Sequence, residues 1–432
     1  MRYTLIINPV IQLNHGIQLS EDGLMLYASS AEAVYRWTYD PDTISVSNRQ
    51  TLINNMTNDG HYTRTLLLSR KEPEMLVVSR GSAANIDQLS AYKNNGISQI
   101  RALNLSELST NDDEETGGIE PFNHATSGRL LGWGLRNSVG MAEHPITGGI
   151  YSVENSADGI ERGGINIKND NPGEELNFHG YLSDPTSGNQ GGHFGYPFCL
   201  ALWDTTISAS NNFTDLGDMQ TGDQFAHDRG FQWLDPDSRP GTEATTESAD
   251  PDLLDGDVDD ARCARDFVPP RLTFKAHMAP LDIKFSPDGT LAYVTWHGSW
   301  NRVDPAGYKV SVFEFDAETG EPVAQPRDTE NVLQDLIWNP NTVQDCPRNC
   351  FRPVGLAVDE AYAARGGKRV FFTSDSTGEI YVLERDTPPP VEGGADEEGA
   401  QDDDDSAAVR AGAGGWMVAG LTVLVAVVGG LL

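Results

Sequence analysis

Basic residues are scarce in this 432-residue chain. Lys and Arg total 30 against 64 Asp and Glu, which gives a formal net charge of −34 at pH 7. A nucleic-acid-binding protein needs a basic surface to neutralise phosphates, so this composition argues against a nucleic-acid partner. The same deficit argues against attraction to an anionic lipid surface. An acidic, self-repelling surface suits a soluble protein outside the cell.

Cysteine is also scarce, with four residues, so this is not a small disulfide-built fold. Cys346 and Cys350 are close enough to close a short loop, and no second Cys or His pair lies at zinc-finger spacing. We therefore expect a Cys346–Cys350 disulfide, formed in an oxidising compartment. The sequence does not determine whether Cys199 and Cys263 pair. Three sequons predict N-glycosylation of a secreted protein: Asn55, Asn104 and Asn212.

The two ends of the chain carry different signals. Residues 387–411 are rich in proline, glycine and acid and predict a disordered linker. Residues 412–432 contain a terminal apolar run that begins at Trp416. Small residues, a spacer and an apolar tail are the order of a GPI-attachment signal, which we favour over a single transmembrane helix. Residues 1–15 lack the pattern of a signal peptide, so we expect the start of a secreted protein to lie further upstream.

Helical periodicity is scarce, and a β pattern recurs instead. Each copy has a short apolar strand, a turn and a second apolar strand. Such repeats stacked radially make a β-propeller; a β-sandwich or a β-helix is the alternative, although the wide, unequal spacing argues against β-helix coils. Residues 204–260 are polar and acidic and predict a long surface insertion. The copies occupy residues 16–30, 64–82, 138–156, 280–299 and 352–376.

Polar residues gather where these strand pairs begin or end, which in a propeller faces the central channel. His61 and Arg64 directly precede an apolar strand, and a histidine there suits a general base, with a surface histidine as the alternative. Arg136 and Asn137 precede the third copy. The planar fork of an arginine suits a carboxylate ligand; an ion pair with one of the many acids is the alternative.

Two further groups of residues suggest ligand binding. Oxygen ligands for Ca²⁺ lie beside turns without EF-hand spacing, and a solvated acidic loop is the alternative. Aromatic and basic residues of the C-terminal half suit a planar anionic cofactor or a sugar face, and a Trp plug between blades is the alternative. G-x-S-x-G, H-E-x-x-H and Walker A patterns are absent. The oxygen set is Glu154, Asn155, Asp158, Glu174 and Glu175; the second set is His277, Trp300, Arg302 and Arg352.

Six phrases in order resemble the glucose/sorbosone dehydrogenase-like propellers, and more narrowly the secreted fungal pyrroloquinoline-quinone (PQQ)-dependent pyranose dehydrogenases. They span residues 13–384. The resemblance implies an all-β, six-bladed β-propeller over residues 1–386, with PQQ across the channel mouth and Ca²⁺ on its quinone side. The resemblance also implies a further blade's worth of strands before the LNHGI phrase, where this chain has only residues 1–12. Because five repeats are present, we therefore expect the first of the six blades to be incomplete. The phrases are LNHGIQLSEDGLMLYASS, GHYTRTLLL with LVVSRGS, LRNSVGMAEHP, GGHFGYP, HGSWNR with GYKV, and CFRPVGLA with TSDSTGEIY.

The resemblance also implies roles for individual residues. His61 would be the catalytic base, taking the hydroxyl proton while hydride passes from the anomeric carbon of the sugar to the quinone. Arg136 and Asn137 would contact PQQ. Arg302 falls near a further cofactor arginine of the family, and Arg352 is a further match. Arg64, His277 and Trp300 are additional cofactor candidates by their residue type and place in the chain. The implied calcium segment is Asn155, Ser156 and Ala157, through backbone carbonyls, with Glu174 and Glu175 as an adjacent acidic stretch.

The sequence thus predicts a secreted, GPI-tethered sugar dehydrogenase that depends on PQQ and Ca²⁺. Its electrons would pass to an external acceptor such as a cytochrome. Two other classes stay open, because a fold does not determine a function. One is a non-catalytic propeller that binds a carbohydrate or a protein, and the other is a Ca²⁺-dependent propeller lactonase, which would need acidic ligands from several blades.

Overall fold

The computed structural model describes residues 7, 11–206, 216–228, 258–364 and 366–385. The expected linker and anchor, most of the predicted insertion, and the sequon at Asn212 lie outside the described residues. Among the residues described, no helix combines the length and the apolar character needed to cross a membrane. Strands dominate this part of the chain, as the β repeats predict.

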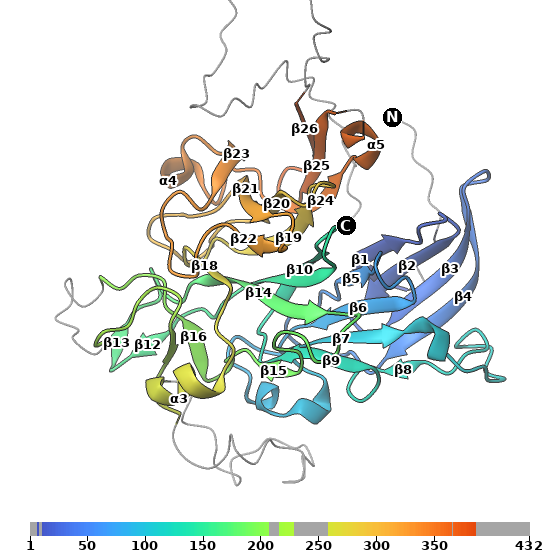
Figure 1. Ribbon diagram of the computed structural model, residues 1–432, viewed down its shortest axis with the longest axis horizontal. Coiled ribbons are helices and arrows are strands. Elements are labelled where there is room, and N and C mark those ends of the chain that lie inside the picture. Colours follow the sequence, from blue (N-terminus) through green and yellow to red (C-terminus); the bar gives the residue numbers. More distant parts are fainter. Residues whose placement is uncertain (1–6, 8–10, 207–215, 229–257, 365, 386–432) are drawn as a thin grey trace, which may run out of the picture.

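Five antiparallel sheets follow one another round the molecule in chain order, from the blue sheet of β1–β4 to the orange-red sheet of β24–β26 (Figure 1). The first is β1 (Leu13–Leu19), β2 (Met25–Ser30), β3 (Val34–Asp40) and β4 (Ser45–Asn54), extended by β8 (Phe122–Asn123). The second is β5 (Leu66–Leu68), β6 (Met75–Arg80), β7 (Gln99–Asn104) and β9 (Arg129–Trp133), extended by β15 (Gly192–His193). The third is β10 (Ser138–Glu143), β11 (Gly149–Glu154), β14 (Glu174–Tyr181) and β18 (Leu272–Phe274).

The last two sheets differ in size. The fourth is β19 (Pro280–Phe285), β20 (Leu291–Trp296), β21 (Lys309–Asp316) and β23 (Gln334–Trp338), with β22 (Glu321–Pro322) also on β21. The fifth has three strands: β24 (Pro353–Val358), β25 (Lys368–Ser374) and β26 (Ile380–Arg385). Two small hairpins are β12 (Glu161–Arg162) with β13 (Ile165–Asn166), and β16 (Cys199–Ala201) with β17 (Gln224–Ala226).

The helices are short. They are the 3-10 helices η1 (Gln88–Ala91), η2 (Lys93–Asn95) and η3 (Leu105–Glu107), and the α-helices α3 (Asp260–Asp266), α4 (Thr342–Asp345) and α5 (Glu360–Ala363).

The propeller arrangement is confirmed. The resemblance implies six blades, whereas the described residues form five. Each of the five sequence repeats builds one sheet. The blade expected to be incomplete would precede β1, where most residues lie outside the described ones, so that expectation stays a prediction. The sheet that begins with β1 has four consecutive antiparallel strands. The blade with three strands is the fifth.

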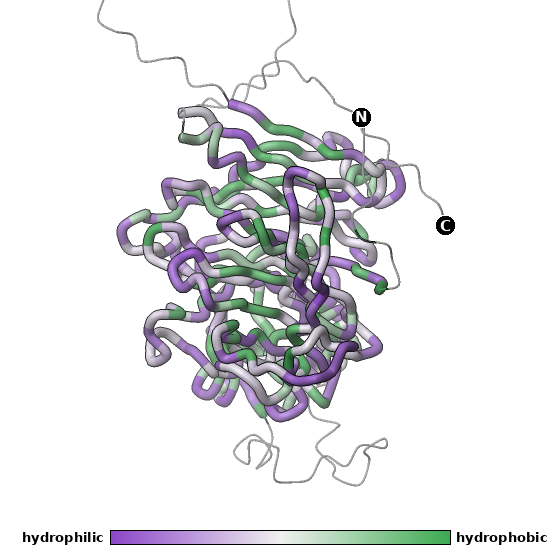
Figure 2. The backbone as a smooth tube through the Cα atoms, turned by 90° about the vertical axis from the view of Figure 1, so that its right-hand side faces the viewer, coloured by the Kyte–Doolittle hydropathy of each residue, from purple (hydrophilic) through white to green (hydrophobic). Residues whose placement is uncertain are grey.

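The turn between the first two strands of a blade explains the recurring Asp-Gly pairs. Gly23 lies between β1 and β2 and Gly289 lies between β19 and β20, each with a φ of 73°. Backbone in this left-handed region is costly for residues with a side chain, so glycine fixes the turn. Hydrophobic residues concentrate in the strands and hydrophilic residues in the turns, as Figure 2 shows along the tube.

The core consists of apolar layers between neighbouring sheets. Leu52 from the first sheet packs with Leu66 and Val78 from the second. Trp296 and Ile283 of the fourth sheet belong to a cluster that also contains residues of the third, and both are fully buried. Burial of a large apolar side chain contributes about 1.5–3 kcal/mol, so these layers hold the blades together.

The innermost strands surround one axis. A cavity of about 250 Å³ is lined by residues of β1, β5, β10, β19 and β24 together, at the ends where these strands finish. The opposite ends, where the same five strands begin, lie on the other side of the sheets. We call that side the mouth. It is formed by the loops before the innermost strands and by residues 81–98, 155–173 and 297–308, which connect strands at the same end.

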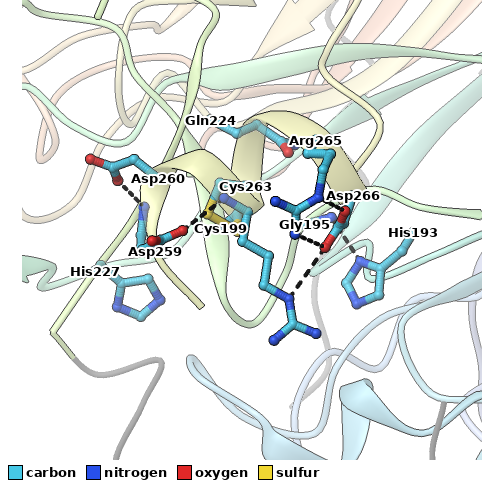
Figure 3. Close-up of a disulfide and its surroundings, with 12 residues drawn as sticks. His193, Gly195, Cys199, Gln224, His227, Asp259, Asp260, Cys263, Arg265 and Asp266 are labelled. Carbon is cyan, nitrogen blue, oxygen red and sulfur yellow. Dashed lines mark hydrogen bonds and ion pairs between the residues drawn. A yellow bond between two sulfur atoms is a disulfide. The ribbon is translucent and has the colours of Figure 1, made fainter. Parts of the chain in front are cut away.

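Two disulfides close loops outside the blades. The predicted Cys346–Cys350 bond is present. Cys199 and Cys263, whose pairing the sequence left open, are bonded with an S–S distance of 2.04 Å, which ties α3 to β16 (Figure 3). All four cysteines are used, and such pairing is typical of proteins folded in an oxidising compartment.

Candidate active site

His61 lies in the loop that leads into β5, at the mouth. Its backbone N–H donates to the carbonyl oxygen of Ser82 at 3.0 Å. Its Nδ1 lies 3.0 Å from that same carbonyl oxygen and 3.0 Å from the Ser82 hydroxyl oxygen. The side chain is half-buried. Burial, and next the charge of Arg136, lower the pKa of His61 to about 4, so the ring is neutral at physiological pH and can accept a proton.

Arg64 shapes the loop that carries His61. It is fully buried and donates to four oxygens of that loop: Met56 O, Asn58 Oδ1, His61 O and Thr63 O. These distances are 2.6–2.7 Å. Its terminal nitrogens are committed to the loop that carries His61, and the prediction that Arg64 contacts a cofactor stays a prediction.

Arg136 and Asn137 precede β10, as the sequence indicates. Arg136 donates to Asn85 O at 3.0 Å and to Asn155 O at 3.1 Å, and its Nη2 lies 3.4 Å from Asp158 Oδ2. It thereby joins three mouth loops. The side-chain amide of Asn137 is half-buried and has no hydrogen-bond partner among the described residues. The side-chain amide of Asn137 is therefore available to a ligand, whereas the guanidinium nitrogens of Arg136 already donate to protein oxygens.

His277 and Arg302 both bond to protein partners in the structure, and their predicted role as cofactor ligands stays a prediction. His277 is buried, with Nε2 bonded to Lys168 O at 2.5 Å and Nδ1 lying 3.3 Å from Asp158 Oδ1. Burial opposes its protonation, but the hydrogen bond to Asp158 and the charge of Glu174 outweigh burial and raise its pKa. The side chain of Arg302 is 3% exposed. Its partners are Asn169 O, Asp170, Ala276 O and Asp304 O.

Trp300 is exposed, whereas Arg352 is partly occupied by hydrogen bonds to the protein. Trp300 is 71% exposed, so it is not the interblade plug that the sequence left open. Arg352 donates from Nε to His297 O at 3.2 Å and from Nη2 to Gly298 O at 2.8 Å, which links the fifth blade to the loop that carries Trp300. Its Nη1 makes no hydrogen bond to the described residues. An exposed indole and a partly free guanidinium suit a planar anion.

The predicted calcium segment offers backbone oxygens. The carbonyls of Ser156 and Ala157 accept no hydrogen bond within the described part of the chain, whereas that of Asn155 accepts from Arg136. The acidic stretch is not arranged as a ligand set. Glu174 accepts from Ser156 N at 2.8 Å and Ala279 N at 2.9 Å. No group of three or more His, Cys, Asp or Glu side chains converges among the described residues.

Two more carboxyls are buried behind this segment. Glu154 accepts from Asn137 N and Ser138 Oγ, and Glu175 accepts from Asn177 Nδ2 at 2.9 Å. Burial raises the pKa of Glu154 to about 8 and that of Glu175 to about 7. Glu154 and Glu175 face each other across β11 and β14. Glu154 and Glu174 accept hydrogen bonds from backbone amides at the mouth and so hold its loops in place.

The predicted glycosylation sites differ in their surroundings. Asn55 is exposed, and its Nδ2 donates to Asn123 Oδ1 at 3.0 Å. Asn104 is half-buried and its Oδ1 accepts from Ser106 N at the start of η3. Both stay predictions.

Comparison with known proteins identifies the family of this chain. A family model described as TrAA12-like matches residues 1–386. The chain belongs to this family. A PQQ-dependent sugar dehydrogenase of Hypocrea jecorina is 44% identical over 86% of this chain and 74% of its own length. A PQQ-dependent pyranose dehydrogenase of Coprinopsis cinerea is 36% identical over 88% of this chain, which spans about half (47%) of that relative.

Solved structures of the TrAA12-like kind agree with the fold. The calcium structure of Trichoderma reesei Carbohydrate-Active Enzymes Family AA12 has a TM-score of 0.74 and 44% identity, covering 88% of this chain and 82% of that one. The holo form of the pyranose dehydrogenase PQQ domain from Coprinopsis cinerea has a TM-score of 0.71 and 32% identity, covering 88% and 83%. The family expected from the sequence is confirmed, and with it the prediction of an oxidoreductase.

Sequence reasoning missed several residues of the TrAA12-like mouth. Asn85 bonds Arg136 through its backbone and side-chain oxygens, and its Nδ2 donates to Asp158 O at 2.7 Å. Asp158 joins Arg136, His277 and Asn301. Asn85 lies in a loop without any motif, so no sequence signal marks it. Asp158 belongs to the oxygen set that the sequence predicts for Ca²⁺, but its bonds to three other loops have no sequence signal.

Proposed function

We propose that this chain oxidises a sugar at its anomeric carbon with PQQ as the electron acceptor and Ca²⁺ as an accessory ion. The observation that carries the proposal is the pairing of a neutral, half-buried His61 with the unpartnered amide of Asn137, at a mouth that also carries Arg136 and Arg352. A base, a polar anchor and positive charge are what hydroxyl oxidation with an anionic quinone requires.

The residues at the mouth fit a planar, carboxylate-bearing quinone. Arg64 and Arg80 are buried and donate hydrogen bonds only to neutral oxygens, while the carboxylate of Asp87 also acts on the charge of Arg80. Their field attracts an anion in spite of the net charge of −34. The amide of Asn137 and Nη1 of Arg352 would hold the carboxylates, Arg136 would add positive charge, and Trp300 would cover a face.

The same loops fit Ca²⁺. It is a hard cation that takes oxygen ligands, backbone carbonyls included. The carbonyls of Ser156 and Ala157 are free of hydrogen bonds from the described residues, and Glu174 fixes the Ser156 amide. These carbonyls would hold the ion, and no acid cluster is needed for it.

Different residues of the chain would carry out different parts of the reaction. His61 accepts the anomeric hydroxyl proton on its free Nε2. Arg64 keeps the His61 loop closed, and Asn137 fixes the ligand on the other side. PQQ, when bound, supplies the two-electron acceptor for the hydride that leaves the sugar carbon. Because reacting atoms must be held within about 0.5 Å of their productive positions, the loop-to-loop bonds at the mouth are part of the chemistry.

Titration of PQQ into the full chain tests this proposal. In the presence of Ca²⁺ we expect saturable quenching of tryptophan fluorescence at one PQQ per chain, with less quenching in Trp300→Phe. Asn137→Ala is expected to weaken binding by about 10-fold, the equivalent of one hydrogen bond to a charged group. Asn189→Ala serves as the control, because Asn189 is exposed and its side chain makes no hydrogen bond to the described residues. Absence of PQQ binding would overturn the dehydrogenase and leave a binding propeller.

A further inference from the structure

The segment that follows β6 connects His61 with the Arg136–Asn137 pair. Ser82 N–H donates to Arg136 O at 2.8 Å, and Ser82 O accepts from His61 N–H at 3.0 Å. The neighbouring Gly81 O accepts from Asn58 Nδ2 at 2.9 Å. Gly81 and Ser82 thus lie between the two halves of the site and bond to both. Neither residue was singled out by the sequence as functional.

The surroundings of Ser82 determine which nitrogen of His61 carries the proton. The Ser82 hydroxyl donates to Ala84 O at 2.6 Å, so its oxygen can only accept from the ring. The Ser82 carbonyl oxygen can only accept as well. Nδ1 of His61 lies 3.0 Å from both oxygens. A ring nitrogen between two acceptors must be protonated, which leaves the lone pair on Nε2.

The surroundings of Gly81 determine how close the two halves come. A Cβ atom at this position would lie 2.8 Å from His61 Cβ, 2.8 Å from Asn137 Oδ1 and 3.1 Å from Arg136 O. The Asn137 oxygen is the end of a side chain and can turn away. His61 Cβ is attached to backbone and cannot move without the loop. The lack of a side chain at position 81 is therefore what lets His61 and Asn137 approach each other.

We propose that Gly81 and Ser82 are positioning residues: Ser82 holds His61 as the Nδ1–H tautomer with Nε2 as the base, and Gly81 sets the separation of His61 from Asn137. This inference rests on the proposed function, since it assigns a task to His61. It concerns a property of the chain itself, and therefore it can be tested without cofactor.

The first test is ¹H–¹⁵N correlation of the histidine rings in full-length protein labelled with ¹⁵N-histidine, with His61→Ala to assign the signals. At pH 7 we expect the protonated nitrogen of His61 to be Nδ1 and the unprotonated one to be Nε2. A ring protonated on Nε2, or a mixture of tautomers, would overturn the assignment to Ser82. The measurement needs neither PQQ nor sugar, so it stands even if the dehydrogenase proposal fails.

The second test is Gly81→Ala beside Gly355→Ala. Position 355 is a matched control, because a Cβ there meets only Thr373 Oγ1 at 3.5 Å. We expect kcat to fall about 100-fold in Gly81→Ala, as for a misplacement near 1 Å, and to stay within twofold of wild type in Gly355→Ala. A kcat in Gly81→Ala within twofold of the control would overturn the role of Gly81. Failure of Gly81→Ala to fold would also overturn the role of Gly81, because position 81 would then support the fold and not only the separation of His61 from Asn137.

Discussion

Replacement of His61 by alanine is expected to lower kcat by about 10²–10⁴-fold, the usual contribution of a general base. The ring is held by Ser82 on one side, and Nε2 is the group left to take the hydroxyl proton. Substitution removes the acceptor without touching the Arg64 bonds to the loop carbonyls. PQQ affinity and Tm should therefore stay close to wild type, which separates loss of the base from loss of the site.

The pH profile gives an independent view of the same residue. Burial and Arg136 lower the pKa of His61 to about 4. Protonation fills the Nε2 lone pair, so the wild-type rate should be level above about pH 5.5 and should fall as the pH approaches 4. An acid limb centred near the ordinary histidine pKa, or a His61→Ala variant that keeps more than a tenth of wild-type kcat, would contradict this role.

Replacement of Arg64 by methionine is expected to lower the free energy of unfolding by about 3 kcal/mol, because four oxygens of the His61 loop lose their donor. Part of that loss is offset, since a buried cation without a carboxylate partner is removed. Burial, and next the charge of Arg80, lower the pKa of Arg64 to about 9. Turnover should fall as well, because the loop then no longer fixes His61. Denaturant unfolding and kcat measure the two effects.

Arg101 provides the matched control for this prediction. It is another buried arginine, but Nε donates only to Ser127 O at 3.2 Å and Nη1 has no partner. Arg101→Met should therefore cost far less stability and leave turnover unchanged. If both methionine variants lose the same stability, then burial of the aliphatic stem, and not the bonds to the loop, explains the effect at Arg64.

The sequence predicted the architecture through its repeats. Five strand-pair phrases became five sheets, because each phrase carries its own turn and its own apolar faces. The count of six came from the family resemblance and not from the residues. The described blade with three strands is β24–β26, and no residue pattern predicts that this blade lacks a fourth strand. Strand number in a blade depends on pairing between segments, which local patterns do not show.

The sequence identified site residues whose role follows from their place beside a strand. It did not identify residues whose role depends on partners that are distant in the chain. His61 and Asn137 lie directly before innermost strands, so strand prediction placed them at the mouth. Arg64 lies in a similar position and Arg302 lies in the segment between β20 and β21, yet backbone oxygens of folded loops accept hydrogen bonds from both. Those oxygens have no sequence signature. Gly81 and Ser82 were overlooked for the same reason, because their importance comes from what they touch.

The most direct test of the account is dye reduction by the full-length protein with Ca²⁺ and PQQ, across a panel of aldoses and ketoaldoses. We expect reduction that requires PQQ, depends on the sugar and is abolished in His61→Ala, while Gly355→Ala retains it. The dye stands in for the external acceptor. Sugar-independent reduction, or PQQ-dependent turnover that is equal in wild type and His61→Ala, would contradict the assignment of sugar oxidation to this mouth.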